Sequence, residues 1–139
     1  MTCLPAAVDM TVRRPCTYQL AIRISRAFRI KVGRLGEFAF PAGRYIYTGS
    51  ARRAMDARLR RHFSQEKKLH WHIDYLLSAP GASITGVVLS DAPECTVNRN
   101  TPGVIVAEGF GASDCTCGCG SHLKRIAGAP ARRRLGRRT

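Results

Sequence analysis

The sequence has 139 residues, of which 23 are Lys or Arg and 9 are Asp or Glu, so its formal net charge at pH 7 is +14. At this length one folded domain is expected, which excludes a disulfide-stapled miniprotein. Because 45% of the residues are hydrophobic, an intrinsically disordered chain is also excluded. The positive charge favours a polyanionic partner, with nucleic acid first among the candidates. No apolar run reaches the roughly 18 residues that span a bilayer and no secretory signal is readable, so a cytoplasmic protein without membrane contact is expected.

Both ends of the sequence are predicted to be tails around a single domain of residues 16–127. Residues 1–15 are mixed in character, and residues 128–139 contain five Arg with almost nothing that could pack. For the Arg-rich end we expect general electrostatic adhesion to a polyanion.

The first part of the domain is predicted to contain β-strands. Residues 18–24 alternate apolar and polar side chains, which is typical of a half-buried strand. Residues 28–32 and 37–40 flank a Gly-bearing turn and predict an edge hairpin. Residues 45–48 predict a further strand, which a Gly-Ser pair closes, and the serine of that pair, Ser50, is a candidate N-cap for the next helix.

Residues 51–63 predict a helix, because they are rich in Ala, Leu and Arg and lack Gly and Pro. Its expected apolar stripe consists of Ala51, Met55, Leu59 and Phe63. Arg58 and His62 lie one turn apart at the edge of this stripe, so they should point toward whatever the helix packs on. Three arginines fall outside the stripe and would serve general adhesion to a polyanion: Arg53, Arg60 and Arg61.

The second half of the domain is predicted to contain two helices and a buried strand. Residues 71–78 predict a helix that Pro80 and Gly81 end, residues 84–89 a strand, and residues 94–99 a short helix after a proline. Residues 109–120 are rich in Gly and Cys and show no periodicity.

A group of polar side chains in these elements suits phosphate chemistry. Tyr45 and Tyr47 share one face of a predicted strand, Gly49 lets the chain turn, and Arg58 and His62 follow on the next helix. Phosphoryl oxygens need a cationic fork, and a water nucleophile needs a group that positions and deprotonates it. Taken singly, each tyrosine would be explained by packing and the arginine by its aliphatic stem. Taken together in a basic chain, they indicate a phosphate site.

These residues resemble the GIY-YIG nuclease superfamily. Tyr18 occupies the position of the first-motif tyrosine, although the motif reads Cys-Thr-Tyr, and the second motif reads Tyr47-Thr48-Gly49. Further matching strings are FPAGRYIYTGSA, RLRRH, EKKLHWHIDYLL, EC, GFGASDC and SHL, which are similar to the Uri branch and cover roughly residues 15–126. The resemblance implies an α/β fold, a small single domain with a short, mainly antiparallel central sheet flanked by helices.

The resemblance also implies an activity, namely metal-dependent hydrolysis of phosphodiester bonds in DNA. Tyr18 would take or orient the proton of the attacking water, Tyr47 would place the phosphate or the water, and Arg58 would stabilise charge on the scissile phosphate. His62 is the rival base, because its unperturbed pKa of about 6.5 lies near neutrality. The family's metal-binding glutamate corresponds by chain order to Glu94, and a single carboxylate suits Mg²⁺ or Mn²⁺.

Two other carboxylates, Glu108 and Asp114, are alternatives for the metal ligand. Contacts with DNA are expected from six polar residues: Arg44, Ser50, Lys67, Lys68, His70 and His72. Trp71 could stack on an unpaired base, but we expect it in the core.

The cysteines allow two interpretations. Cys115, Cys117 and Cys119 alternate before His122, with Cys95 available from elsewhere. Reduced, buried thiols are the default without a secretory signal. The alternative is a structural Zn²⁺, for which Cys95, Cys115, Cys117 and His122 are the candidate ligands.

An endonuclease is thus the predicted function. A basic nucleic-acid-binding protein that keeps this scaffold without the activity is the alternative.

Overall fold

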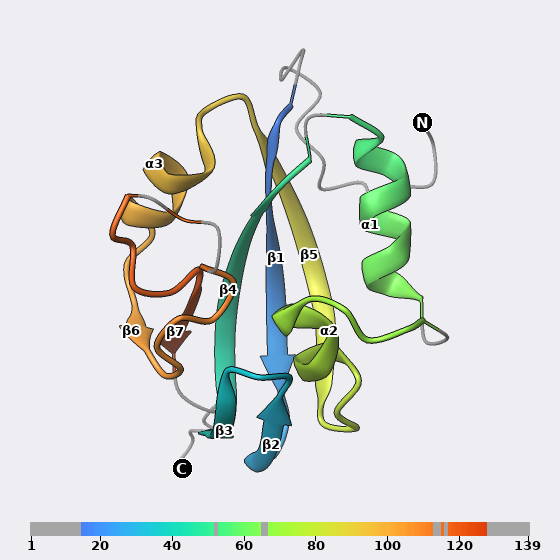
Figure 1. The fold of residues 1–139 in the computed structure, drawn as a ribbon, viewed down its shortest axis with the longest axis vertical. Helices are drawn as coiled ribbons and strands as arrows, with labels where there is room; N and C mark the ends of the chain where they lie inside the picture. The colour runs from blue at the N-terminus through green and yellow to red at the C-terminus, as the bar shows by residue number, and fades with distance from the viewer. Residues whose placement is uncertain (1–14, 52, 65–66, 113–114, 116, 128–139) are drawn as a thin grey trace, which may run out of the picture.

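Five strands form one antiparallel sheet in the computed structural model, which describes residues 15–51, 53–64, 67–112, 115 and 117–127 (Figure 1). Their order across the sheet is β5 (Ala82–Ser90), β1 (Thr17–Ile24), β4 (Gly43–Ser50), β7 (Leu123–Ala127) and β6 (Val104–Ile105). A second sheet pairs β2 (Phe28–Val32) with β3 (Gly36–Phe40). The helices are α1 (Met55–Phe63), α2 (His72–Leu77) and α3 (Glu94–Arg99). The expected α/β class with a mainly antiparallel sheet is confirmed.

The strand β1 lies between β5 and β4 and carries the centre of the core. Its apolar residues Leu20 and Ile22 are fully buried. The register pairs Leu20 with Tyr47 and Ile22 with Tyr45 of β4. Because directly opposed residues share one face of a sheet, the tyrosines of β4 lie on the same face as the apolar residues of β1.

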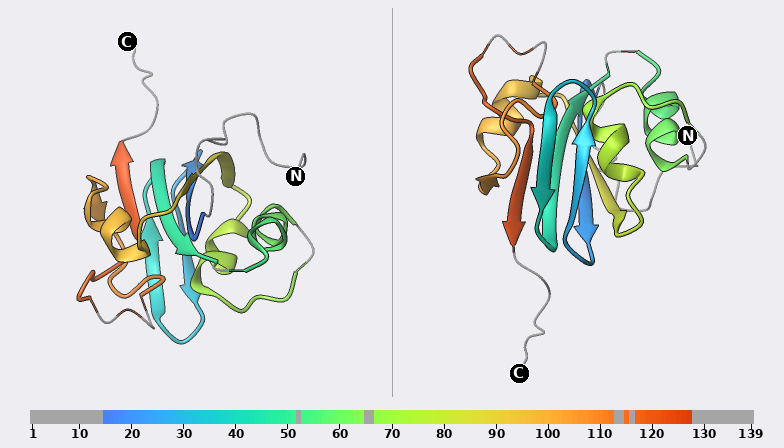
Figure 2. Two further views of the ribbon diagram at one scale, coloured as in Figure 1. Left: turned by 90° about the horizontal axis from the view of Figure 1, so that it is seen from above. Right: turned by 60° about the horizontal axis from the view of Figure 1, so that its bottom comes forward.

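Helices cover both faces of this sheet (Figure 2). Leu59 of α1 and Ile73 of α2 are buried in the same core cluster as Tyr18. Gln19 alternates with Tyr18 and so faces the other way, where its amide donates to the hydroxyl of Thr101 just after α3. The helices α1 and α2 therefore lie on the face of Tyr18, and α3 lies behind it.

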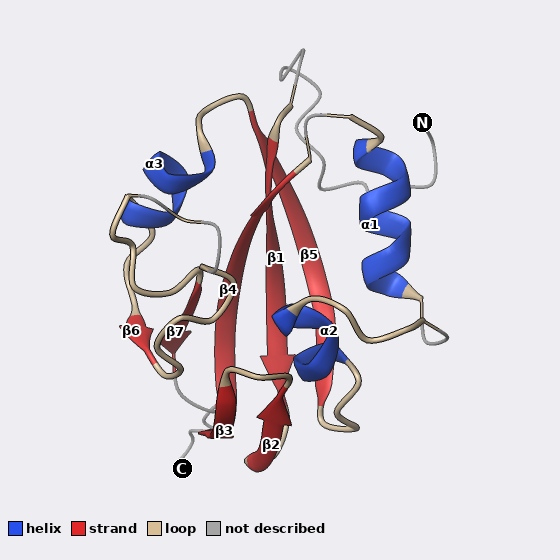
Figure 3. Ribbon diagram, in the orientation of Figure 1, coloured by secondary structure: helices blue, strands red, loops and turns tan. Residues whose placement is uncertain are grey.

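The hairpin of β2 and β3 closes one end of the core. Phe40 at the end of β3 is fully buried, and its ring contacts those of Tyr45 and Phe110. The predicted hairpin is confirmed, and so are the predicted strands within β1, β4 and β5. The helix at residues 94–99 has the predicted bounds, and residues 109–120 contain no helix or strand where they are described (Figure 3).

The prediction that Ser50 caps the first helix is wrong. Ser50 is the last residue of β4, where it pairs with Thr17 of β1, and α1 begins only after Ala54. Pairing between distant strands thus extends β4 beyond the point where local sequence favours a helix. Phe63, which was expected in the apolar stripe, is 45% exposed. His62 takes its place on the buried face of α1.

Two short strands were not predicted, β6 and β7. They pair with each other and, through β7, with β4, so residues after the loop of 109–120 return to the sheet. No helix among the described residues is long and apolar enough to cross a bilayer. The predicted tails lie outside the described residues, apart from Pro15.

Candidate active site

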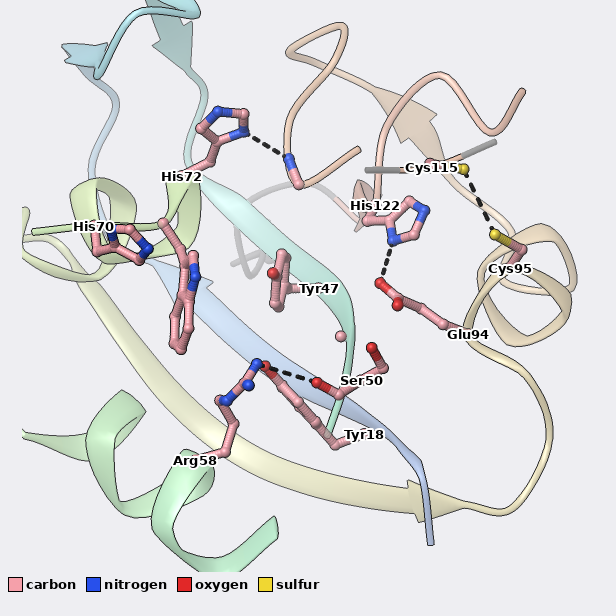
Figure 4. A pocket seen from close by; sticks show the side chains of 13 residues that line it. Tyr18, Tyr47, Ser50, Arg58, His70, His72, Glu94, Cys95, Cys115 and His122 are labelled. Carbon is pink, nitrogen blue, oxygen red and sulfur yellow. Dashed lines mark hydrogen bonds and ion pairs between the residues drawn. The ribbon is translucent and has the colours of Figure 1, made fainter. Parts of the chain in front are cut away.

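Residues from six segments line a pocket of about 350 Å³ (Figure 4). They come from β1, β4, α1, α3, the segment from His70 into the start of α2, and the loop before β7. The lining residues are Tyr18, Tyr47, Gly49, Ser50, Arg58, His70, Trp71, His72, Glu94, Cys95, Gly111, Cys115 and His122. Four residues expected to act on a phosphate are therefore neighbours, although up to 76 positions separate them in the chain: Tyr18, Tyr47, Arg58 and Glu94.

Tyr18 reaches the pocket from β1 with His62 behind it. Its hydroxyl Oη lies 2.6 Å from Nε2 of His62, which is 2% exposed and does not line the pocket. Burial raises the pKa of Tyr18 to about 12, although the nearby Arg58 guanidinium opposes this shift. Burial lowers the pKa of His62 to about 4, so its imidazole is neutral at neutral pH. A neutral imidazole can accept the hydroxyl proton of Tyr18 at Nε2.

Gly49 makes room for Tyr18. It lies opposite Tyr18 in the register of β1 and β4, and a Cβ at this position would be 2.5 Å from both Cζ and Oη of the tyrosine. From the sequence, Gly49 was expected to let the chain turn. The structure instead shows an extended strand whose missing side chain is required by the phenol ring.

Arg58 extends from α1 and is held by two contacts. Its Nη1 donates to the main-chain carbonyl oxygen of Ser50 at 3.1 Å, and its guanidinium carbon lies 4.3 Å from the centroid of the Trp71 ring. Trp71 is half-buried and lines the pocket, so it belongs to the site as well as to the core against which it packs. Its ring keeps Arg58 at the pocket wall.

Arg61 has a structural role that the sequence analysis missed. Its Nη1 and Nη2 donate to both carboxylate oxygens of the buried Asp74, each at 2.9 Å. Burial favours the neutral acid, but the hydrogen bonds from Arg61 and from backbone N–H groups outweigh it and lower the pKa of Asp74. The prediction that Arg61 serves general adhesion is wrong, because its guanidinium joins α1 to α2 and also lies 4.3 Å from the Trp71 ring. Asp74 lies in the first turn of α2, where acidic residues are typical, and its carboxylate also accepts from the backbone N–H groups of His70 and Trp71.

Glu94 enters the pocket from the first turn of α3. Its Oε2 lies 2.6 Å from Nδ1 of His122. Burial disfavours the carboxylate, but hydrogen bonds from His122 and Ser50 outweigh it and lower the pKa of Glu94. Burial also disfavours the imidazolium of His122, but the bond with Glu94 and the nearby thiols of Cys115 and Cys119 raise its pKa to about 9. An ionised carboxylate in the pocket fits a divalent cation.

Next to Glu94 lies a cluster of side chains that could hold a metal ion. One donor atom from each of Cys95, Cys115, Cys119 and His122 lies within 4.8 Å of all the others. The cluster contains Cys119 in place of the predicted Cys117, which is exposed and interacts with the thiol of Cys95. The cysteines in the described part of the chain are free, and none of them is fully buried.

The residues expected to contact DNA divide into two groups. Ser50, His70 and His72 line the pocket. Arg44, near the start of β4, and Lys68 are both exposed, and neither lines the pocket. The ammonium group of Lys67 donates to the main-chain oxygens of Arg61 and His62 and so satisfies the C-terminal end of α1.

Two carboxylates were the alternative metal ligands. Glu108 is exposed and outside the lining, and Asp114 lies outside the described residues. Of the arginines expected on the outer face of α1, Arg53 and Arg60 are exposed.

Residues 17–136 match the family model described as "Domain of unknown function DUF123". The chain belongs to this family. The match covers both sheets, all three helices and every residue that lines the pocket. No curated protein and no solved structure matched the chain.

Proposed function

We propose that this DUF123 domain is a metal-dependent endonuclease that hydrolyses phosphodiester bonds in DNA. One observation carries the proposal: Tyr18, Tyr47, Arg58 and Glu94 line a single pocket in a chain of net charge +14. These are the positions that carry the resemblance to the GIY-YIG nucleases. A guanidinium and a metal-binding carboxylate can stabilise charge on a phosphodiester under in-line attack by water, and phenols can position the water and move its proton.

In this proposal Tyr18 and His62 divide the work of the general base. A free Tyr18 phenolate at pH 7, with a pKa of about 12, would cost about 7 kcal/mol. No free phenolate forms if Tyr18 takes the proton of the attacking water while its own proton passes to Nε2 of His62, 2.6 Å away. Protonating His62 at pH 7, with a pKa of about 4, costs about 4 kcal/mol. Tyr18 lines the pocket and His62 does not, so the tyrosine would meet the water and the histidine would receive the proton.

Arg58 and Tyr47 would bind and orient the phosphate. The guanidinium of Arg58 offers paired donors for phosphoryl oxygens. Burial raises the pKa of Tyr47 well above its ordinary value, so its hydroxyl stays protonated and can donate to the phosphate or the water. Glu94 would hold Mg²⁺ or Mn²⁺, and such an ion would neutralise charge on the scissile phosphate.

The cluster of Cys95, Cys115, Cys119 and His122 would hold a second metal of a different kind. Thiolate and imidazole donors favour Zn²⁺, whereas carboxylate and water favour Mg²⁺. The proposal therefore assigns zinc to this cluster and the catalytic divalent ion to Glu94.

The test incubates the purified chain with labelled single-stranded, duplex and branched DNA and with RNA, in Mg²⁺, in Mn²⁺ and in EDTA. We expect metal-dependent cleavage of DNA that Glu94→Ala abolishes while DNA affinity stays within a few-fold. Tight, salt-sensitive binding of DNA without cleavage in any metal would refute the enzyme and identify a nucleic-acid-binding protein on this scaffold.

A further inference from the structure

The cluster of Cys95, Cys115, Cys119 and His122 has the donors and the spacing of a tetrahedral zinc site. A Zn–S distance of about 2.3 Å in a tetrahedron places two sulfurs about 3.8 Å apart. Sγ of Cys95 lies 3.5 Å from Sγ of Cys115, and all four donors lie within 4.8 Å of one another. Cys95 comes from α3 and the other ligands from the segment before β7, so one ion would join two separate parts of the chain.

His122 supplies an independent sign of a missing ligand. The residue is 2% exposed, and its Nδ1 contacts Glu94. Its other ring nitrogen, Nε2, is buried and has no hydrogen-bond partner among the described residues. The ring lies between Glu94 and the sulfur atoms of Cys95 and Cys115 (Figure 4), so Nε2 faces the thiols. Buried polar atoms are rarely left without a partner, and a metal ion at this place would satisfy Nε2.

The loop that carries Cys115 and Cys119 is shaped to bring them to one point. Gly118 and Gly120 have φ values of 72° and 80°, which an L side chain rarely adopts. The backbone N–H of Cys117 donates to Sγ of Cys115 at 3.4 Å. Such a bond stabilises a thiolate, which is the form that binds a metal. Cys117 itself is exposed and is not one of the four residues of the cluster, although its thiol interacts with that of Cys95.

We propose that Cys95, Cys115, Cys119 and His122 bind one Zn²⁺ and that this ion positions Glu94 through the His122 ring. When Nε2 coordinates the metal, Nδ1 carries the proton and donates it to Glu94 at the 2.6 Å contact. The imidazole is then fixed at both ends, and the carboxylate of Glu94 is held in the pocket. His122 is therefore a positioning residue for the candidate catalytic carboxylate. This second part rests on the proposed function, whereas zinc binding does not.

Metal content of the full chain tests the first part. We expect one zinc per chain by elemental analysis after purification without chelators, and visible absorption bands of tetrahedral Co²⁺ with thiolate charge transfer after cobalt exchange. Cys119→Ser should lose the zinc, and Cys117→Ser, the matched control two positions away, should keep it. Glu94→Gln should also keep it, because the amide oxygen can still accept from Nδ1. A wild-type chain without zinc, or zinc that Cys117→Ser removes and Cys119→Ser retains, would overturn the site.

Binding of Mn²⁺ to Glu94, followed by electron paramagnetic resonance, tests the second part without any need for cleavage. Loss of a group that orients a metal ligand typically weakens metal binding by about 10- to 100-fold. We expect that weakening in Cys119→Ser and not in Cys117→Ser, with circular dichroism showing that both fold. If folded, zinc-free Cys119→Ser binds Mn²⁺ as tightly as the wild type, zinc does not position Glu94. Zinc binding without nuclease activity would refute the proposed function and leave the zinc site standing, whereas cleavage by a zinc-free wild type would refute this inference and leave the proposed function standing.

Discussion

Replacing Gly49 with alanine should displace Tyr18. The new Cβ would lie 2.5 Å from Cζ and Oη of the phenol, whereas carbon atoms in contact are normally about 3.5–4.0 Å apart. The ring must therefore move by about 1 Å, because both residues belong to paired central strands that have little freedom to yield. This shift breaks the 2.6 Å hydrogen bond between Tyr18 and His62.

Two consequences are measurable. Forcing a group into a packed core typically costs about 1–3 kcal/mol, so urea denaturation should show a loss of unfolding free energy in this range. A misplacement of about 1 Å at a reacting group can cost about 100-fold in rate, so single-turnover DNA cleavage should fall by that order. The matched control is Gly86→Ala in β5, on the other side of β1, where the added Cβ meets only Cβ of Ala21 at 3.8 Å. If Gly49→Ala unfolds and cleaves like Gly86→Ala, the close approach at Tyr18 has no consequence and the reasoning fails.

Two further predictions concern His62 and Trp71. The pKa of His62 is lowered to about 4, so its neutral form stabilises the fold above the unfolded pKa of 6.5, and this contribution is lost as the pH falls toward 4. Between pH 7 and pH 4 the wild type should lose about 3 kcal/mol more unfolding free energy than His62→Gln, measured by urea denaturation. An equal loss in the two proteins would contradict the buried neutral imidazole. Trp71→Leu removes the ring that lies 4.3 Å from the Arg58 guanidinium, a contact worth about 0.5–2 kcal/mol. Cleavage should therefore slow by roughly 2- to 30-fold. DNA affinity, measured by fluorescence anisotropy, should be nearly unchanged. Trp71→Phe should restore most of the rate, and wild-type cleavage by Trp71→Leu would show that the ring does not hold Arg58.

The elements that the sequence predicted best are those that depend on local pattern. The spacing of Leu20, Ile22 and Ile24 at every second position is a local signal of a strand, and Pro93 marks the start of the helix at 94–99. The start of α1 was mispredicted because Ser50 is held in β4 by its pairing with Thr17, a contact across 33 positions. The strand β7 was missed because it is short and contains Lys124 and Arg125, which suit a strand only through its pairing with β4 and β6.

In the candidate site too, some features follow from local sequence and others depend on the tertiary structure. Tyr18, Tyr47, Arg58 and Glu94 were predicted to act together because their strings resemble one superfamily, and the structure places all four in one pocket. The choice of Cys119 over Cys117 depends on the path of a glycine-rich loop, which spacing alone does not determine.

Contacts that bridge separate elements were also beyond the sequence analysis. The hydrogen bond between Glu94 and His122, the close approach of Gly49 to Tyr18 and the stacking of Arg58 on Trp71 each join residues from different segments. Each of them depends on tertiary packing and leaves no periodic signal in the chain.

The central claim is that this pocket cleaves phosphodiester bonds, and the role of Arg58 tests it most directly. The measurement compares single-turnover cleavage of labelled DNA in saturating Mg²⁺ by the wild type, Arg58→Ala and Arg23→Ala, with DNA affinity determined in parallel. Arg23 is the matched control, because it is an exposed arginine of β1 outside the pocket and its replacement removes the same charge. We predict cleavage by the wild type and by Arg23→Ala, and none by Arg58→Ala although it still binds DNA. Equal cleavage by Arg58→Ala and Arg23→Ala, or cleavage that persists in EDTA, would contradict the assignment of this pocket.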